Sequence, residues 1–305
     1  MTTLATGRTR KLRRDASGTA QHSLWGKEAS AKAIPFIKWA GGKSQLLSKI
    51  QPFYPREPYE TYFEPFLGGG AVFFDLRPRI AFLTDSNKEL ITAYRVVKSS
   101  VEELIVRLDK LAAEYHEDSE KTYYRVRDDW DLTELDPISR VARFIFLNKT
   151  CYNGLYRVNR QGKFNVPWGK EKNSTICEPE KLLAASQALR GALLRSMDFR
   201  EALKAIGGTD FVYVDPPYQP VSKTASFTGY TKDQFGMEDQ VDLAEELARL
   251  DRAGARFLLS NSFSRELESL YRQFGFKVTY VTAPRAISSN PKTRGQTKEL
   301  LIRNY

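Results

Sequence analysis

The sequence predicts an α/β protein with a mostly parallel central sheet and helices on both of its faces. Short apolar runs alternate along the chain with segments whose apolar residues recur at helical spacing. This alternation is typical of parallel sheets, in which a helix connects one strand to the next. Several of the apolar runs end in Gly, Asp or Asn, and in such sheets ligands bind beyond the carboxyl ends of the strands.

The elements are expected in the following order. Strands are predicted at residues 61–66, 80–84, 211–214, 256–259, 276–282 and 299–303. Helices are predicted after Gly70 and at residues 86–98, 101–115, 137–150, 241–248 and 267–274.

The middle of the chain breaks the strand–helix alternation, which indicates a second domain within the 305 residues. Residues 111–200 combine helical stretches with a loop-rich basic block at 151–172, so we expect an inserted, mainly helical and loop domain there. The sheet domain would then comprise 34–110 and 201–305. Residues 1–33 hold seven Lys or Arg and two acids without apolar periodicity, and are expected to form a disordered basic tail.

Charge and the counts of Cys and His favour some classes of function and exclude others. The formal charge is +10 and the sequence pI is about 9.4, which favours a polyanionic partner, nucleic acid first and an anionic membrane second. Two cysteines, Cys151 and Cys177, exclude a disulfide framework and a thiolate metal cluster. The two histidines, His22 and His116, are far apart in sequence, so no metal site is expected. No membrane span or signal peptide is readable, and a cytoplasmic location is expected.

A glycine loop, Gly68 to Gly70, follows the first predicted strand and precedes a helix. Glycine lets the backbone approach a nucleotide closely. Phe73 is too bulky for the third glycine of a dinucleotide fingerprint, and Ile37 stands where a phosphate-binding P-loop around Gly42 needs glycine. Asp85, at the end of the next strand, could accept hydrogen bonds from a ribose; a plain turn and a helix cap are the alternatives for these two features.

The most specific motif is Asp215-Pro216-Pro217-Tyr218, directly after a hydrophobic strand. Two prolines fix the backbone and remove two N–H donors, so the turn presents acceptors: carbonyl oxygens and the Asp215 carboxylate. Tyr218 adds a flat aromatic face. Acceptors beside a flat face suit the exocyclic amino group of a planar base, whereas a rigid turn with a structural tyrosine is the alternative.

Several separated motifs, in order, resemble the Dam-type N6-adenine DNA methyltransferases of the alpha group. They are Lys-Trp-Ala-Gly-Gly-Lys at 38–43, Phe-Leu-Gly-Gly-Gly at 66–70, the block at 148–157, Gly-Lys-Phe-Asn-Val-Pro at 162–167, Asp-Pro-Pro-Tyr at 215–218 and Arg-Ala-Ile-Ser-Ser-Asn at 285–290. The resemblance covers about residues 35–305. It implies a Rossmann-like, S-adenosylmethionine-dependent methyltransferase fold.

The resemblance implies S-adenosylmethionine as the cofactor, without a metal, and double-stranded DNA as the substrate. The cofactor would lie against Trp39, Lys43, Phe66, Gly68, Gly70, Asp85 and Asp215. The catalytic residues would be Asp215, Pro216, Pro217 and Tyr218: Asp215 and the Pro216 carbonyl would accept the two amino hydrogens of an adenine flipped out of the duplex and stacked on Tyr218. No cysteine nucleophile is needed.

Recognition is expected in the basic 148–170 block. By resemblance, the DNA-binding residues are Lys38, Tyr152, Asn153, Leu155, Arg157, Pro167, Arg285, Ser288, Ser289 and Asn290, with GATC as the target. Arg157 would read a guanine edge; a phosphate contact is the alternative. The protein is expected to be monomeric in solution, with more than one copy able to occupy one DNA.

Two other functions remain open on the sequence alone. The same cofactor could serve an RNA adenine or a cytosine amino group, although cytosine-amino enzymes more often have Ser at the position of Asp215. Alternatively, the protein could bind DNA and cofactor as a regulator without turnover. The sequence also leaves open whether it acts alone or beside a restriction enzyme.

Overall fold

A computed structural model describes residues 32–128, 135–218, 235–284 and 296–305. Its strands are β1 (Tyr62–Glu64), β2 (Ala81–Asp85), β3 (Ala192–Ser196), β4 (Phe211–Val214), β5 (Arg256–Ser262), β6 (Lys277–Pro284) and β7 (Gln296–Arg303). Its α-helices are α1 (Leu47–Ile50), α2 (Ala71–Leu76), α3 (Lys88–Ser99), α4 (Val101–Glu117), α5 (Ser119–Asp128), α6 (Pro137–Thr150), α7 (Pro179–Ala188), α8 (Phe199–Lys204), α9 (Met237–Arg252) and α10 (Arg265–Gln273).

The described strands form one seven-stranded sheet in the order β3-β2-β1-β4-β5-β7-β6. The first five strands in this order are parallel, and β7 runs antiparallel to both of its neighbours, β5 and β6. The strand order reverses at β1 and β4, whose carboxyl ends lead into the glycine loop and into Asp215. In open α/β sheets this is the point at which ligands bind. The α/β class with a mostly parallel sheet is confirmed.

Each strand buries alternate residues on opposite faces, as a pleated strand requires. On one face Phe63, Val212 and Phe257 pack with apolar residues of α8, α9 and α10. On the other, Tyr62 and Tyr213 join a larger core that includes α2 and α3. Helices therefore cover both faces of the sheet.

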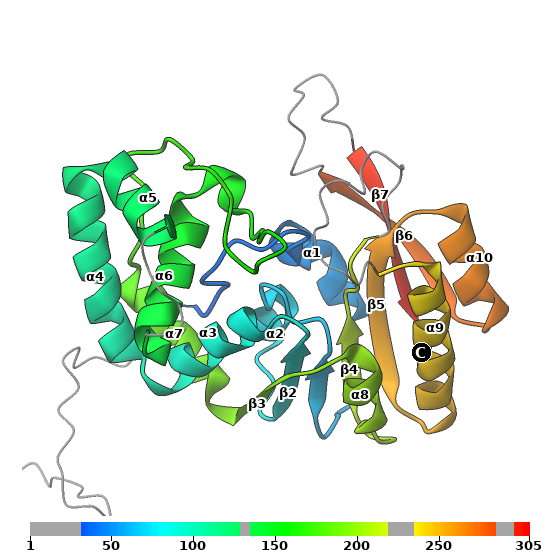
Figure 1. The fold of residues 1–305 in the computed structure, drawn as a ribbon. Coiled ribbons are helices and arrows are strands. Elements are labelled where there is room, and N and C mark those ends of the chain that lie inside the picture. Colours follow the sequence, from blue (N-terminus) through cyan, green and yellow to red (C-terminus); the bar gives the residue numbers. More distant parts are fainter. Residues whose placement is uncertain (1–31, 129–134, 219–234, 285–295) are drawn as a thin grey trace, which may run out of the picture.

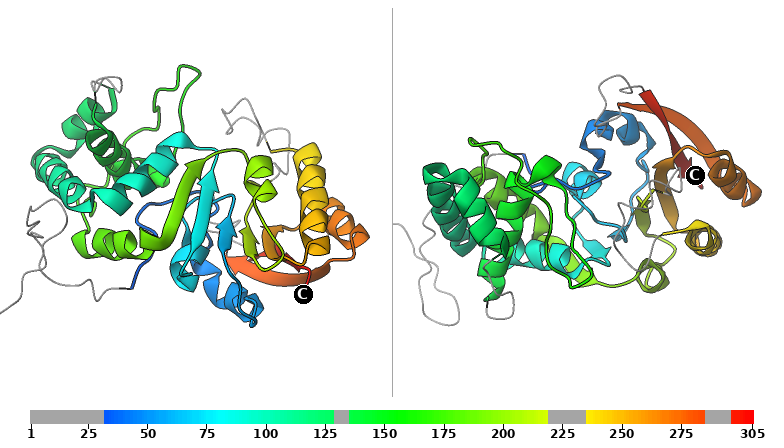
Figure 2. Two further views of the ribbon diagram at one scale, coloured as in Figure 1. Left: turned by 90° about the horizontal axis from the view of Figure 1, so that it is seen from below. Right: turned by 45° about the horizontal axis from the view of Figure 1, so that its top comes forward.

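The larger core continues from α3 into the helices α4 to α7. These helices lie at one end of the molecule, while β6, β7 and α10 lie at the other (Figures 1 and 2). The basic block after α6 folds back on itself through two antiparallel bridges, Cys151 with Trp168 and Val158 with Phe164. We keep the division into a sheet domain and an inserted recognition domain as a proposal.

Strand β3 is an element that the sequence analysis missed, inside the range assigned to the recognition domain. It pairs with β2 over five residues at the edge of the catalytic sheet. Its exposed Leu193 and Arg195 alternate with the buried Ala192 and Leu194, so the period-2 signal was present but weakened by an outward leucine. Residues 192–196 are therefore part of the sheet, although the proposed division assigns them to the recognition domain.

The start of the folded part also differs slightly from expectation. Ala33 is buried and Lys32 pairs with Asp75 at 3.2 Å, so both belong to the folded domain and not to the expected 1–33 tail. The remainder of that basic segment, residues 1–31, lies outside the described residues.

Candidate active site

A cavity of about 920 Å³ opens at the carboxyl ends of the central strands. Its wall contains every residue that the sequence analysis assigned to catalysis or to the cofactor: Trp39, Lys43, Phe66, Gly68, Gly70, Asp85, Asp215, Pro216, Pro217 and Tyr218. The glycine loop and the Asp-Pro-Pro-Tyr turn, almost 150 residues apart in sequence, thus border one space.

The glycine loop is held open by its backbone geometry. Gly68 and Gly70 have positive φ values of 47° and 66°, which side-chain-bearing residues rarely adopt. A Cβ on Gly68 would lie 2.9 Å from the Trp39 ring, and one on Gly70 would lie 2.8 Å from the Tyr94 hydroxyl. Both glycines are therefore required by space as well as by conformation, and the plain-turn reading does not account for the close approach of Trp39.

Asp85 closes β2 and is tied to the loop rather than to the following helix. Its two carboxylate oxygens accept the N–H groups of Gly68 at 3.0 Å and of Asn87 at 2.9 Å. The cap of α3 is instead Asn87, whose side chain accepts the Leu90 N–H. Burial raises the pKa of Asp85, and the two N–H groups oppose that rise.

Asp215 is bonded to Lys43, a pairing that sequence separation of 172 residues concealed. The Lys43 ammonium lies 2.6 Å from Oδ1 and 2.8 Å from Oδ2, and it also donates to the Gly41 carbonyl. The Ser260 hydroxyl donates to Oδ1 at 3.0 Å. Burial raises the pKa of Asp215, whereas the Lys43 charge and these hydrogen bonds lower it.

Lys43, which was expected to lie against the cofactor, therefore lies against the Asp215 carboxylate within the same cavity wall. Only 3% of Lys43 is exposed, and its ammonium lies 4.9 Å from the centre of the Tyr218 ring. The Lys43 ammonium is thus buried between the Asp215 carboxylate, whose charge it neutralises, and the Tyr218 ring. An ionised carboxylate has more lone pairs than the contacts with Lys43 and Ser260 use, so Oδ2 of Asp215 can accept a further hydrogen bond.

Tyr218 has a buried partner that the sequence analysis did not find. Its hydroxyl donates to Oε1 of Glu299, on β7, at 2.5 Å. Glu299 is 6% exposed, and its other oxygen has no hydrogen-bond partner among the described residues. Tyr218 is 39% exposed and borders the cavity, so its hydroxyl is fixed while part of the side chain stays accessible.

A second buried acid, Glu64, lies directly before the glycine loop. It is 2% exposed and accepts the Tyr62 hydroxyl at 2.6 Å. Burial raises the pKa of Glu64 to about 8, partly opposed by that hydrogen bond and increased further by the charge of Asp215. It also lines the cavity, and nothing local in the sequence distinguished it from a solvated strand residue.

Three phenylalanine rings form another part of the cavity wall. Phe66, which was predicted, lies beside Phe199 and Phe235, which were not. Asp198, Arg200 and Asp239 line the cavity beside them. The signal that could have found them is the pattern of an edge strand followed by a capping aspartate, since Asp198 accepts the Arg200 N–H at the start of α8.

The basic block is joined to the cavity through residues 38 and 39. The Asn148 side chain accepts the Lys38 N–H and donates to the Lys38 and Gly154 carbonyls. The Trp39 ring stacks on Tyr156 with centroids 5.6 Å apart. Lys38, predicted to contact DNA, is thus held against the turn that carries Tyr152 and Asn153.

Of the remaining recognition candidates, some lie within the described residues and four lie outside them. Tyr152 is 48% exposed, Asn153 has a positive φ of 56°, and Arg157 is held by Asn165, which accepts from the guanidinium with both its side-chain and its backbone oxygens. Leu155 is partly buried, and the Pro167 carbonyl accepts the Tyr152 N–H. The structure therefore gathers Lys38, Tyr152, Asn153, Leu155, Arg157 and Pro167 in one block. Arg285, Ser288, Ser289 and Asn290 lie outside the described residues.

The donor set of the cavity fits an adenosine-bearing cofactor. Aromatic rings suit a purine, the buried Asp85 carboxylate beside a glycine cradle suits a ribose, and the volume lies within the range of small-molecule sites, about 300–1,000 Å³. The described residues contain no group of three or more His, Cys, Asp or Glu suited to a metal ion. None of the helices in the described ranges has the length and apolarity needed to cross a membrane.

Fold and cavity together define a class: a Rossmann-like methyltransferase, with its site at the strand-order reversal of a mostly parallel sheet. The chain belongs to the D12 class N6 adenine-specific DNA methyltransferases, whose family model matches residues 39–287. It is thus a DNA adenine methyltransferase of the Dam type, and the predicted family and enzyme class are confirmed. DNA is its substrate, which removes the RNA and cytosine alternatives.

Curated relatives agree over nearly the whole folded region. The chain is 44% identical to the type II methyltransferase M.MjaIII of Methanocaldococcus jannaschii, over 89% of this chain and 99% of the relative. It is 40% identical to the type II methyltransferase M1.LlaDCHI of Lactococcus lactis, over 89% and 95%. It is 35% identical to the DNA adenine methylase of Escherichia coli, over 87% and 93%.

Proposed function

We propose that the protein transfers a methyl group from S-adenosylmethionine to N6 of an adenine that is flipped out of double-stranded DNA, within the sequence GATC. The observation that carries this proposal is the shared cavity of about 920 Å³, bordered by the glycine loop with Asp85 and by the Asp215–Tyr218 turn. A cofactor held by the first group would meet a base held by the second.

The residues of the turn would act on the amine. S-adenosylmethionine, when bound, supplies an electrophilic methyl group. The adenine amine is a weak nucleophile because its lone pair is delocalised into the ring. Asp215 and the Pro216 carbonyl would accept its two hydrogens, orient the lone pair and stabilise positive charge on nitrogen. This direct transfer of the methyl group requires no covalent enzyme intermediate.

The Tyr218 ring would stack on the extruded base and regain part of the flipping cost, a few kcal/mol by the usual estimate. Its hydrogen bond to Glu299 supports this role, because it fixes the hydroxyl while part of the side chain stays accessible at the cavity.

At the cofactor end, we propose that Asp85 accepts from the ribose hydroxyls and that Phe66, Gly68, Gly70 and Trp39 enclose the adenosine. The carboxylate already accepts one N–H on each oxygen, and an ionised carboxylate has further lone pairs to offer. This arrangement supports S-adenosylmethionine as the cofactor.

For the target sequence, we propose that Arg157 reads a guanine edge, that Lys38 contacts the outer guanine, and that Tyr152, Asn153, Leu155 and Pro167 contact or wedge the neighbouring bases. The exposure of Tyr152 and the Asn165-held guanidinium of Arg157 support this proposal. Arg285, Ser288, Ser289 and Asn290 are proposed to hold the backbone beside the flipped base.

Methylation of paired duplexes tests the proposal directly. Labelled S-adenosylmethionine is incubated with a duplex containing one GATC and with a duplex of equal composition in which that site is scrambled. We expect label at N6 of adenine in the first duplex and at least a hundredfold less in the second. Label on adenine in another sequence context would contradict GATC alone, and the absence of label from every duplex would contradict the whole proposal.

We further propose that the protein is a monomer in solution and that more than one copy can occupy one DNA. Sedimentation velocity of the free protein, followed by titration onto duplexes with one and with two GATC sites, measures both. A dimer at micromolar concentration in the absence of DNA would contradict the first part.

A further inference from the structure

Three phenylalanine rings from separate elements pack against one another as an aromatic cluster in the cavity wall. The Phe66 centroid lies 5.2 Å from that of Phe199 and 5.6 Å from that of Phe235, and the latter two are 5.5 Å apart. Phe66 follows β1, Phe199 begins α8 and Phe235 precedes α9. Since α8 has only six residues and α9 comes from a distant segment, the three rings keep this arrangement only if the two helices are held together.

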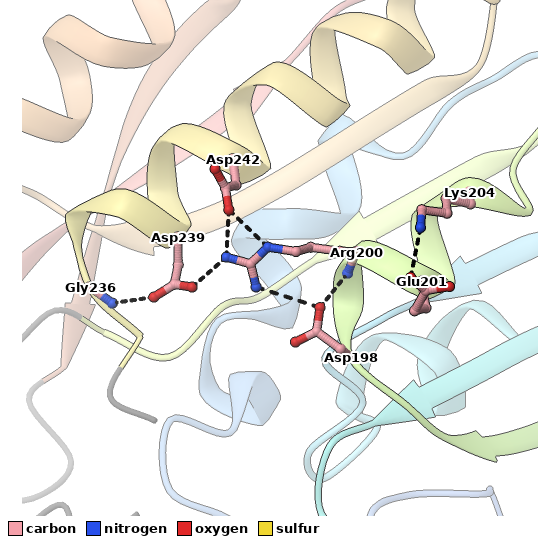
Figure 3. Close-up of polar contacts among 7 residues, drawn as sticks. All are labelled: Asp198, Arg200, Glu201, Lys204, Gly236, Asp239 and Asp242. Atoms are coloured by element: carbon pink, nitrogen blue, oxygen red, sulfur yellow. Dashed lines mark hydrogen bonds and ion pairs between the residues drawn. The ribbon is translucent and has the colours of Figure 1, made fainter. Parts of the chain in front are cut away.

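Arg200 joins the two helices through its polar contacts (Figure 3). Its guanidinium donates to Asp242 through Nε at 2.8 Å and Nη2 at 2.6 Å, and to Asp239 at 2.6 Å. It also lies 3.5 Å from Asp198 and over the Phe199 ring, 4.4 Å from its centroid. One side chain thus connects the first turn of α8, the first turn of α9 and one ring of the aromatic cluster.

The partner Asp239 extends this connection to the chain that enters α9. Its second oxygen accepts the Gly236 N–H at 2.7 Å, directly after Phe235 (Figure 3). The position of the Phe235 ring therefore depends on α9, which Arg200 holds. Arg200, Asp239 and Asp198 all line the cavity.

A second arginine joins the same helices away from the cavity. Arg249, in the last turn of α9, donates to the Leu203 carbonyl of α8 at 2.8 Å and pairs with Glu246 at 2.8 Å. Neither Arg249 nor Leu203 lines the cavity. The α8–α9 contact therefore has two polar joints, and Arg200 forms the one beside the three rings.

We propose that Arg200 is a positioning residue for the cofactor: by holding α8 to α9 it sets the position of the aromatic cluster of Phe66, Phe199 and Phe235, against which the purine of an adenosine-bearing ligand packs. The inference rests on the proposed function, in which that ligand is S-adenosylmethionine. Arg200 is 38% exposed and its carboxylate partners are 27–53% exposed, so the ion pairs themselves add little to the stability of the fold. Their effect is expected in the affinity for the ligand.

Calorimetric titration with S-adenosylhomocysteine, the demethylated product, measures that affinity without turnover. We expect Arg200→Ala to raise Kd at least tenfold while the melting temperature falls by only a few degrees. The matched control, Arg249→Ala, should stay within twofold of the parent Kd. In steady-state assays with DNA, Arg200→Ala should raise KM for S-adenosylmethionine about tenfold and leave kcat within twofold.

The outcomes distinguish a failure of the proposed function from a failure of the role of Arg200. No binding by the unaltered protein would overturn the proposed function itself. Binding by the unaltered protein with Arg200→Ala within twofold of it would overturn the role of Arg200 alone. Equal losses in Arg200→Ala and Arg249→Ala would also overturn it, because general helix packing would then explain both. If Arg200→Ala fails to fold by circular dichroism, Asp242→Asn replaces it, with an expected loss of about threefold.

Discussion

The rim of the cavity and the basic block after α6 carry different parts of the proposed reaction, and they are built differently. At the rim, Asp85, Asp215 and Tyr218 are each fixed by hydrogen bonds from other segments of the chain. In the basic block, Tyr152 stands exposed and Arg157 is held within one short loop. Chemistry needs groups that are oriented before the substrate arrives, whereas base contacts need groups that still reach outward.

The largest effect is expected from removing the Asp215 carboxylate at the rim of the cavity. Asp215→Ala should lower kcat by about 10³-fold, the usual scale for one oriented group that stabilises transition-state charge, while Kd for S-adenosylhomocysteine changes only a few-fold. Single-turnover methylation and calorimetry measure the two quantities. Asp215→Asn is the matched variant, because its amide oxygen can still accept from Lys43 and Ser260. Turnover of Asp215→Ala within tenfold of the parent would remove Asp215 from the mechanism.

A second prediction concerns the free energy of unfolding and how it depends on the buried Glu64 carboxyl. The pKa of Glu64 is about 8 in the fold and about 4.5 when solvated, so the folded protein retains a proton that the unfolded chain loses between these values. Stability relative to Glu64→Gln should therefore fall as pH rises from 4.5 to 8 and then level off. The gap between the two proteins is expected to widen by about 5 kcal/mol over this range. Urea unfolding of both proteins from pH 5 to 8.5 measures it, and parallel curves would contradict the shift.

The third prediction concerns the basic block. Arg157→Ala should relax discrimination at one base pair by about 1–3 kcal/mol if the guanidinium reads a guanine edge. Methylation rates on duplexes with each single substitution in GATC measure this. If every sequence weakens alike and the salt dependence becomes shallower, Arg157 contacts phosphate instead. Asn165→Ala, which releases the guanidinium without removing it, should show a smaller loss at the same base pair.

The smallest effect is expected from changing the hydrogen bond between Tyr218 and Glu299 at the rim of the cavity. Glu299→Gln and Tyr218→Phe should each lower kcat about fivefold, the scale of one hydrogen bond of about 1 kcal/mol. Because both changes disturb one contact, the double variant should be no slower than the worse single variant. Losses that multiply in the double variant would show that Glu299 acts apart from Tyr218.

The sequence predicted most of the sheet and the elements around it, because periodicity and turn residues are local signals. The 211–214 strand has the predicted bounds, and the helix predicted at 86–98 occurs at 88–99. Strand β3 escaped because its outward Leu193 blurs the alternation. In the site, motif residues could be named in advance since they stand together in sequence.

What the sequence could not predict is pairing between distant segments. Lys43 with Asp215, Tyr218 with Glu299 and the Arg200 contacts join residues 39 to 172 positions apart. No local pattern marks such partners, and only the strand order brings them to the same edge of the sheet. The roles proposed for the site residues remain predictions that the experiments above address.

Strand β7 inserts between β5 and β6 although it is made after both, and it carries the carboxylate that holds Tyr218. Until β7 pairs with β5, the β5 edge lacks a neighbour on that side and the Tyr218 hydroxyl lacks Glu299 as its acceptor. Completion of this edge of the sheet and fixing of the Tyr218 ring are therefore expected to occur in the same folding step.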